Sequence, residues 1–259
     1  MYRKETCYAG KTIEVRKYHN YHVPPPGDTR GERTSETSEA HKKANDRRRR
    51  TDFRRKLNTA FEKGDLYLTL TYKENPPEKI RDLQKDGQEF CKILKKYYKE
   101  KEQDLRYMWV MGAGVRTRRH IHMVINNIGD MSFLESLWEH GHVKIEYIYD
   151  DSLKDLAAYM MENAEQTMEL AKQRGENIRR YYFTSHGLPK PVVIKEDIPA
   201  ATFRKTVYEK SIEKKGYYLE KESEYYGIDE MGYEYYGYTL IRIDDDKDIH
   251  RHGRAEPKG

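Results

Sequence analysis

Residues 66–72 read LYLTLTY, a pattern that repeats every second residue. Three leucines fall on one side of an extended chain, and Tyr67, Thr69 and Thr71 fall on the other, as in a strand with one buried face. The next residues, ENPP at 74–77, interrupt the pattern with two prolines. The segment therefore predicts a half-buried strand that ends before the prolines.

The chain after these prolines alternates between helical and strand spacing of its apolar residues. In order, the pattern predicts a helix over about 78–100, strands over 106–111 and 119–126, a short helix over 132–141 and a strand over 142–149. Together with the first strand, this is the β-α-β-β-α-β order of the ferredoxin-like split βαβ fold. We therefore expect an α+β fold with an antiparallel sheet, both helices on one face and an active site on the open face.

Two further helices and two polar segments flank this unit. Apolar residues at i, i+4, i+7 and i+8 predict a basic helix over 39–62, and a second apolar stripe predicts a helix over 152–173. We expect an irregular N-terminal arm over 1–38, a main domain over 39–195 and an acidic, tyrosine-rich extension over 196–259. We interpret the tyrosines of the extension as part of a packing hairpin.

Charge is distributed unevenly along the 259 residues, whose net charge is +5. Residues 41–56 hold nine Lys or Arg against two Asp, whereas residues 220–248 hold ten Asp or Glu against three Lys or Arg. A concentrated basic segment is typical of contact with nucleic acid, although a solvated helix face gives the same pattern. The basic run therefore indicates nucleic-acid binding only in combination with other motifs.

Cysteine usage and hydropathy exclude several classes of protein. Cys7 and Cys91 lie far apart without a CxxC motif, so we expect neither a disulfide framework nor a zinc module. No apolar run approaches the roughly 18–20 residues that span a bilayer, and the first ten residues lack the apolar stretch of a signal peptide. We expect a cytoplasmic protein without a membrane partner.

A pair of histidines lies in the middle of the strand expected over 119–126. His120 and His122 fall on one face of the strand, and the apolar residues that alternate with them fall on the other. Their Cα atoms are expected to lie about 6–7 Å apart, which lets two imidazoles share one ion. We expect these histidines to bind Mg²⁺ or Mn²⁺, with oxygen ligands or water completing the shell; the alternative is a structural pair.

A polar ridge runs along the helix expected over 152–173. Tyr159, Glu162 and Gln166 follow i, i+3 and i+7 spacing beside the apolar stripe. A tyrosine in a helix rich in Ala and Met is ordinarily a packing residue, so spacing alone does not make Tyr159 catalytic.

Several segments together resemble the rolling-circle replication initiation (Rep) proteins of plasmids, phages and integrative elements, within the HUH endonuclease superfamily. The resemblance is closest to the Rep proteins of Gram-positive bacteria and their mobile elements. The segments that carry it are NTAFEKGDLYLTLTYKENPP (58–77), RRHIHMVIN (118–126), LWEHGHVKIEYI (137–148), LAAYMMENA (156–164) and YYFTSHGLPKP (181–191).

The resemblance implies a site-specific DNA nicking and strand-transfer reaction. His120 and His122 correspond to the metal ligands of the family, and Tyr159 corresponds to its nucleophile. The phenol would attack a phosphodiester of single-stranded or hairpin origin DNA, which gives a 5′-phosphotyrosine and a free 3′-OH. A host DNA polymerase would extend that end in the bacterial cytoplasm. Because the sequence has no GxxxxGK[ST] motif, we expect a host helicase to separate the strands.

Two positions depart from the pattern of the family. A lysine usually lies three residues after the tyrosine, where this chain has Glu162; that residue is either a metal ligand or base, or a helix-surface substitution. Relatives often carry an acidic third ligand about eight residues before the first histidine, where this chain has Gly112. Glu146, in the last strand, is one candidate for the missing ligand.

Two groups of arginines are candidates for DNA contact. Phosphates pair with arginine side chains, and the alternative for each group is a solvated surface. The residues are Arg116, Arg118 and Arg119 beside the histidine strand, and Arg47, Arg48, Arg49 and Arg50 in the basic helix, which we expect to bind origin duplex.

Two alternative functions remain open from the sequence. The first keeps the chemistry in a transposase or conjugative relaxase of a mobile element. The second is a non-catalytic regulator that binds origin DNA with the same fold.

Overall fold

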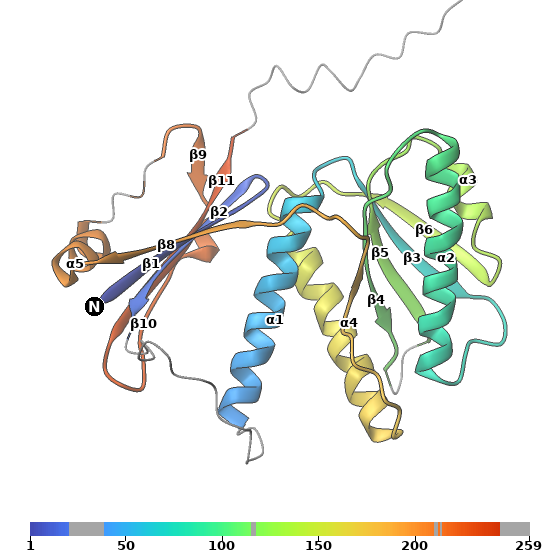
Figure 1. The fold of residues 1–259 in the computed structure, drawn as a ribbon, viewed down its shortest axis with the longest axis horizontal. Helices are drawn as coiled ribbons and strands as arrows, with labels where there is room; N and C mark the ends of the chain where they lie inside the picture. The colour runs from blue at the N-terminus through green and yellow to red at the C-terminus, as the bar shows by residue number, and fades with distance from the viewer. Residues whose placement is uncertain (21–38, 115–117, 210–211, 213, 244–259) are drawn as a thin grey trace, which may run out of the picture. The chain divides into compact units, whose positions relative to one another are not determined.

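The computed structural model describes residues 1–20, 39–114, 118–209, 212 and 214–243 (Figure 1). The chain divides into two compact units. One unit contains residues 35–190, and the other combines residues 1–34 with residues 191–259. The expected main domain thus corresponds closely to the first unit.

The first unit contains a five-stranded antiparallel sheet in the order β6-β3-β5-β4-β7. Its strands are β3 (Leu66–Tyr72), β4 (Tyr107–Gly112), β5 (His120–Ile125), β6 (Gly141–Tyr147) and β7 (Phe183–Thr184). Helix α2 (Ile80–Glu100) connects β3 to β4, and the short helix α3 (Met131–Ser136) connects β5 to β6. The predicted element order and the ferredoxin-like α+β fold are confirmed.

One face of this sheet carries the leucines of β3 and packs against α2 and α3. Leu66, Leu68 and Leu70 are fully buried in a cluster with apolar residues of β5 and of α2, such as Ile121 and Phe90. The strict alternation of the 66–72 segment therefore has the consequence expected from sequence, since every second residue enters this core.

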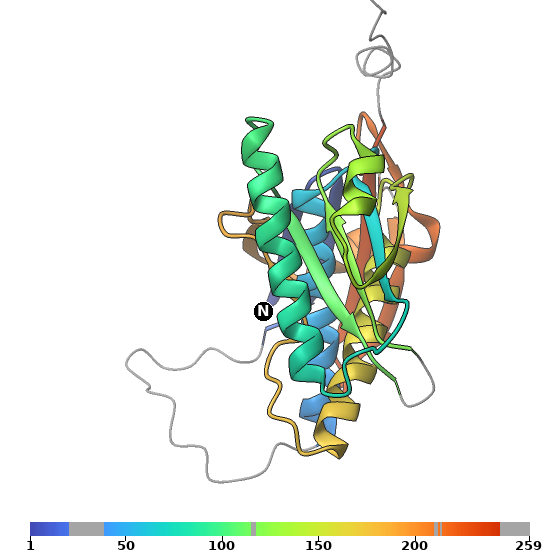
Figure 2. The same ribbon diagram turned by 90° about the vertical axis from the view of Figure 1, so that its right-hand side faces the viewer.

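The opposite face is not as open as expected. Helices α1 (Glu39–Ala60) and α4 (Lys154–Gln173) lie on this face, as Figures 1 and 2 show. The strands also present apolar side chains here, and Val110 and Val124 join Phe53 of α1 and Met160 of α4 in a second buried cluster. Because these valines need cover from water, the face is exposed only in part, beside α4.

The helix boundaries differ slightly from those expected. Asp130 caps α3 and accepts a hydrogen bond from the Phe133 backbone at 3.2 Å, so Ser132 does not form the expected cap. Leu153 precedes α4 in the left-handed conformation, with φ of 47°.

The second unit contains a six-stranded antiparallel sheet that the sequence did not predict. Its path is β10-β11-β2-β1-β8, and β9 pairs with β11. The elements are β1 (Tyr2–Ala9), β2 (Thr12–His19), β8 (Val192–Ile198), α5 (Ala200–Glu209), β9 (Tyr217–Leu219), the 3-10 turn η1 (Lys221–Ser223), β10 (Tyr225–Ile228) and β11 (Glu234–Arg242).

The expectation of an irregular N-terminal arm is wrong for residues 2–19, which form the β1–β2 hairpin. Gly10, with φ of 59°, occupies the turn between these strands. Ile13 and Val15 join Leu240 of β11 in a small core. The strands are stabilised by pairing with distant C-terminal strands, which local alternation cannot reveal. The rest of the arm, residues 21–38, lies outside the described residues.

The tyrosine-rich extension contains the expected hairpin, in which β10 pairs with β11. Tyr236 is buried there, whereas Tyr226 is exposed. No helix among the described residues is long and apolar enough to cross a membrane.

Candidate active site

Two histidine side chains lie next to each other on the sheet face that α4 covers in part. In the register of the sheet, His122 lies between Thr69 and Val110, and His120 lies between Thr71 and Gly112. The centroids of the two imidazole rings are 4.5 Å apart. The structure therefore places both predicted ligands on one face, as their spacing indicates.

His122 is held rigidly beneath the surface. Its side chain is only 2% exposed, and its Nδ1 atom lies 2.6 Å from the hydroxyl of Tyr67 and 3.4 Å from that of Thr69. Its Nε2 atom is buried without a hydrogen-bond partner. When Nδ1 carries the proton and donates it to the Tyr67 oxygen, the lone pair on Nε2 can bind a cation.

Burial also controls the protonation of His122. It lowers the pKa of this imidazole to about 3; the neighbouring His120 contributes in the same direction, and Asn163 opposes the shift. The ring is consequently neutral at ordinary pH, which is the form that a cation requires.

His120 is oriented by contacts at both ring nitrogens. Its Nδ1 atom lies 2.7 Å from the backbone oxygen of Arg118, which can only accept a hydrogen bond, so Nδ1 carries a proton. Its Nε2 atom lies 3.2 Å from Oδ1 of Asn163. In the neutral ring, Nε2 is also an acceptor, and two acceptors at this distance need a proton or a cation between them.

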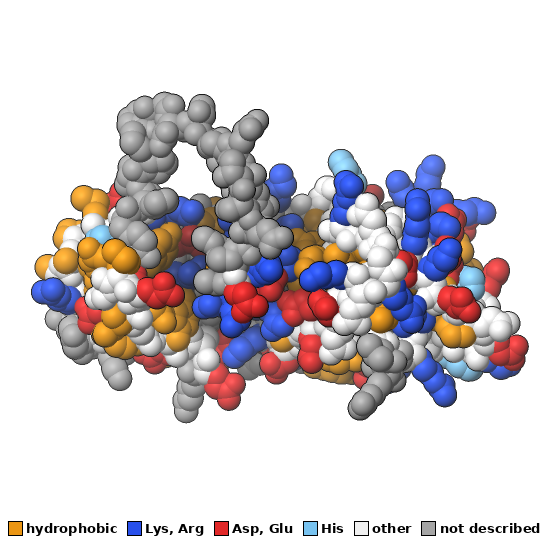
Figure 3. All heavy atoms as spheres, turned by 90° about the horizontal axis from the view of Figure 1, so that it is seen from below, with side chains coloured by type: hydrophobic (Ala, Val, Ile, Leu, Met, Phe, Trp, Pro, Cys, Tyr) orange, Lys and Arg blue, Asp and Glu red, His pale blue; other side chains and the backbone are white. Residues whose placement is uncertain are grey.

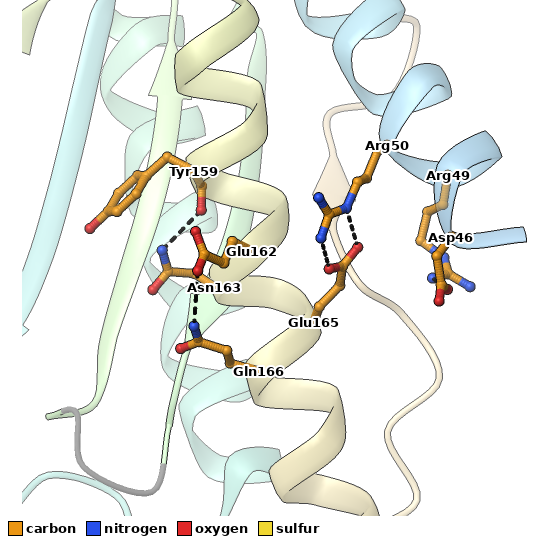
Figure 4. Close-up of polar contacts among 8 residues, drawn as sticks. All are labelled: Asp46, Arg49, Arg50, Tyr159, Glu162, Asn163, Glu165 and Gln166. Carbon is orange, nitrogen blue, oxygen red and sulfur yellow. Dashed lines mark hydrogen bonds and ion pairs between the residues drawn. The ribbon is translucent and has the colours of Figure 1, made fainter. Parts of the chain in front are cut away.

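Asn163 comes from α4 and is oriented within that helix. Its amide nitrogen donates to the backbone oxygen of Tyr159 at 2.9 Å, which directs the amide oxygen toward His120 (Figure 4). Two imidazole nitrogens and one amide oxygen thus come together without an internal partner for Nε2 of His122. This donor set fits a divalent cation, because Mn²⁺ and Mg²⁺ accept amide oxygens and Mn²⁺ also accepts imidazole.

Gly112 provides the space that the His120 ring occupies. A Cβ atom at this position would lie 2.1 Å from Nε2 of His120, which is far inside contact distance. An acidic residue here, as relatives often have, would collide with the imidazole in its present position. The structure therefore gives a physical reason for the glycine, and α4 supplies an oxygen in place of the missing carboxylate.

Tyr159 lies next to the histidines. Its side chain is 49% exposed, and its ring centroid is 4.9 Å from that of His122, with the rings inclined at 63°. Figure 4 shows Tyr159 and Glu165 on different sides of α4, with Glu165 directed at α1. The phenol is therefore accessible to a substrate and adjacent to the candidate cation site.

Neither glutamate that the sequence singled out contacts the histidine rings in the described residues. Glu162 is exposed, and its carboxylate accepts a hydrogen bond from Gln166 at 3.4 Å. Glu146 shares the histidine face, but it lies opposite Tyr67 and pairs with Lys144 at 3.0 Å. Asn163 and Tyr67 were the residues that sequence reasoning missed; i+4 spacing from Tyr159 and the alternation of β3 were the available signals.

The arginines beside β5 point in different directions. Arg118 is exposed, and by alternation it shares the face of His120. Arg119 falls on the opposite face, where its guanidinium lies 3.5 Å from the Gly114 oxygen; burial and the charge of Arg174 lower its pKa. Arg118 is therefore better placed than Arg119 for a phosphate at the histidines. Arg116 lies outside the described residues.

The four arginines of α1 divide into two pairs. Arg50 forms two hydrogen bonds with Glu165 of α4, one at 2.8 Å, and Arg49 pairs with Asp46 at 2.7 Å and lies 3.6 Å from the centre of the Tyr181 ring. Arg47 and Arg48 are exposed. The second pair is available for DNA, whereas Arg50 fastens α1 to the helix that carries Tyr159 (Figure 4).

The fold and the site together define a class of domain. It has a ferredoxin-like strand order and presents a His-apolar-His pair beside a tyrosine from a helix. Residues 65–167 match the family model of the replication-associated protein ORF2, and this range includes the histidines, Tyr159 and Asn163. The match confirms the resemblance to rolling-circle replication proteins and indicates a role in replication initiation. No curated protein and no solved structure matches the chain.

Proposed function

We propose that the chain is a metal-dependent endonuclease that nicks one strand of origin DNA and thereby starts rolling-circle replication. The observation that carries the proposal is the convergence of three potential ligand atoms beside an accessible phenol. These atoms are Nε2 of His120, Nε2 of His122 and Oδ1 of Asn163, and the phenol is that of Tyr159.

His120, His122 and Asn163 would hold Mg²⁺ or Mn²⁺ at this site. The bound cation would polarise an oxygen of the scissile phosphate and stabilise the charge that develops there. Tyr67 and the Arg118 carbonyl fix the two imidazoles by contacts at their Nδ1 atoms, so that both Nε2 atoms point toward the phosphate.

Tyr159 would act as the nucleophile. Its oxygen forms a bond to phosphorus as the phenol loses its proton, and the bond from phosphorus to the 3′ oxygen breaks. The 3′ oxygen takes up a proton and becomes a free hydroxyl, while the 5′ phosphate stays on the tyrosine. The reverse reaction rejoins the strand, which accounts for a ligase activity in the same site.

The exposed cations suggest where DNA lies. Arg118 is placed for a phosphate near the nick, and Arg47 and Arg48 for the duplex beside it. Lys and Arg side chains are interspersed with Asp and Glu side chains on the face shown in Figure 3, so binding would depend on such local groups. A host helicase and a host polymerase would supply strand separation and extension in a bacterial cytoplasm.

The test is capture of a covalent adduct. The chain is incubated with Mn²⁺ and a pool of randomised single-stranded oligonucleotides, and the product is separated under denaturing conditions. We expect an adduct that Tyr159→Phe abolishes and that Tyr149→Phe retains, since Tyr149 is an exposed tyrosine outside the site. Absence of an adduct with every oligonucleotide, together with retained DNA binding, would identify a regulator instead.

A further inference from the structure

A groove lies on the opposite side of the sheet from the histidines, between α2 and the segment that contains β7. It has a volume of about 490 Å³, which is within the range of ligand sites. The residues that line it are Gln88, Cys91, Lys92, Lys95, Tyr107, Trp109, Arg180, Tyr182, Phe183 and Thr184. All of them belong to the first unit.

The walls of the groove are positively charged. Lys92 and Lys95 project from α2, and Arg180 projects from the opposite wall; all three are exposed. None of the ten described lining residues is acidic. Lys92 pairs with Glu89 at 2.6 Å, but both side chains are more than half exposed, so this pair is weak and leaves the lysine able to exchange partners.

The floor of the groove is aromatic and rigid. Trp109 is 1% exposed and stacks on Phe183, with centroids 4.0 Å apart and an interplanar angle of 15°. Tyr182 is half-buried, and its hydroxyl accepts a hydrogen bond from Lys56 of α1 at 2.9 Å. Tyr107 is also half-buried, so two tyrosine rings remain partly accessible at the floor.

This combination of cations and aromatic rings suits nucleic acid. Phosphates pair with Lys and Arg along an open groove, and bases stack on aromatic side chains. An enclosed site for a small molecule would instead surround its ligand with buried polar groups, whereas the cations here stand at the exposed rim.

We infer that this groove binds the phosphate backbone of single-stranded DNA at a distance from the nick. Trp109 packs in the cluster under α2, while the histidines point to the other face, so a strand in the groove cannot touch Tyr159 at the same nucleotide. The inference rests on the proposed function only for the identity of the polyanion. It assigns the groove to holding the strand rather than to chemistry.

The test measures binding without cleavage. A fluorescent single-stranded oligonucleotide is titrated with the full chain in EDTA, over a range of salt concentrations. The variant Lys95→Gln/Arg180→Gln removes one cation from each wall. The control Lys96→Gln/Arg179→Gln makes the same charge change in the same two segments, at positions that do not line the groove.

We expect the groove variant to bind about tenfold more weakly at moderate salt and to lower the slope of log affinity against log salt by about 1.4, since two phosphate contacts are lost. The control should bind nearly as the parent chain does. Equal effects of the two variants, or no effect of the first, would overturn the inference. Competition by a free mononucleotide as complete as by the oligonucleotide, at equal phosphate concentration, would also overturn it. Because no step requires nicking, failure of the proposed nickase activity would leave this result interpretable.

Discussion

The Nε2 atom of His120 lies 3.2 Å from Oδ1 of Asn163, and no proton is available between them while the Nδ1 proton of His120 faces the Arg118 carbonyl. This relationship joins the central strand of the sheet to the helix that carries Tyr159. It also makes the asparagine, four residues after Tyr159, the oxygen donor of the candidate cation site.

Replacement of Asn163 should weaken cation binding. Asn163→Ala removes the amide oxygen, and we expect the affinity for Mn²⁺, measured by isothermal titration calorimetry, to fall at least about tenfold. Asn163→Asp should retain or increase the affinity, because it keeps an oxygen at this place and adds a charge. Gln166→Ala, one turn further along α4, is the matched control; an equal loss in that variant would mean that the helix surface as a whole, and not Asn163, is responsible.

Gly112→Ala should displace the His120 ring. The added methyl group would lie 2.1 Å from Nε2, and overpacking of this kind costs about 1–3 kcal/mol of folding free energy. In a His120→Ala background the same substitution should cost almost nothing, because the clashing ring is absent. Denaturant unfolding of the four proteins of this double-mutant cycle measures the difference. Equal costs in both backgrounds would show that the ring does not occupy this space.

His122 should make the metal-free protein less stable in acid. Its pKa is lowered to about 3 in the folded chain, so the unfolded chain takes up a proton near pH 6.5 that the folded chain excludes. The stabilisation is complete above that pH and decreases as the pH falls toward the folded value. Between pH 7 and pH 5 we expect the loss to be about 2 kcal/mol larger than in His122→Gln, as measured by urea unfolding in EDTA. The same pH dependence in both proteins would mean that His122 is exposed to solvent.

The arginines of α1 should separate into two functional pairs. Arg47→Ala/Arg48→Ala should weaken duplex DNA binding and lower the salt slope by about 1.8, with little change in thermal stability. Arg50→Ala should reduce stability by less than about 1 kcal/mol, because its ion pair with Glu165 is half exposed. Fluorescence anisotropy and thermal unfolding on both variants test the division. Loss of duplex binding only in Arg50→Ala would reverse the assignment.

Much of the main domain could be predicted from the sequence, because its strands alternate strictly and pair with near neighbours in the chain. The alternation of 66–72 and of 120–125 placed the leucines in the core and both histidines on one face. The N-terminal strands escaped prediction because β1 pairs with β8, about 190 residues away, and such pairing leaves no local pattern.

The candidate site was predictable in its outline and not in its details. The His-apolar-His pair is a local pattern, whereas the contact of Asn163 with His120 depends on how α4 crosses the sheet. The sequence favoured Glu162 or Glu146 as oxygen donors because carboxylates are the commoner ligands. The helix turns Glu162 outward, and the register of β6 places Glu146 beside Tyr67. The role of Gly112 likewise depends on the ring that lies over it.

The most direct measurement is mass spectrometry of the peptide that carries DNA after reaction with Mn²⁺ and single-stranded oligonucleotides. We predict a 5′-phosphonucleotide on Tyr159, and no such peptide from His120→Ala or in EDTA. Attachment of the nucleotide to any other residue, or its continued formation without the histidine and the cation, would contradict the proposed chemistry.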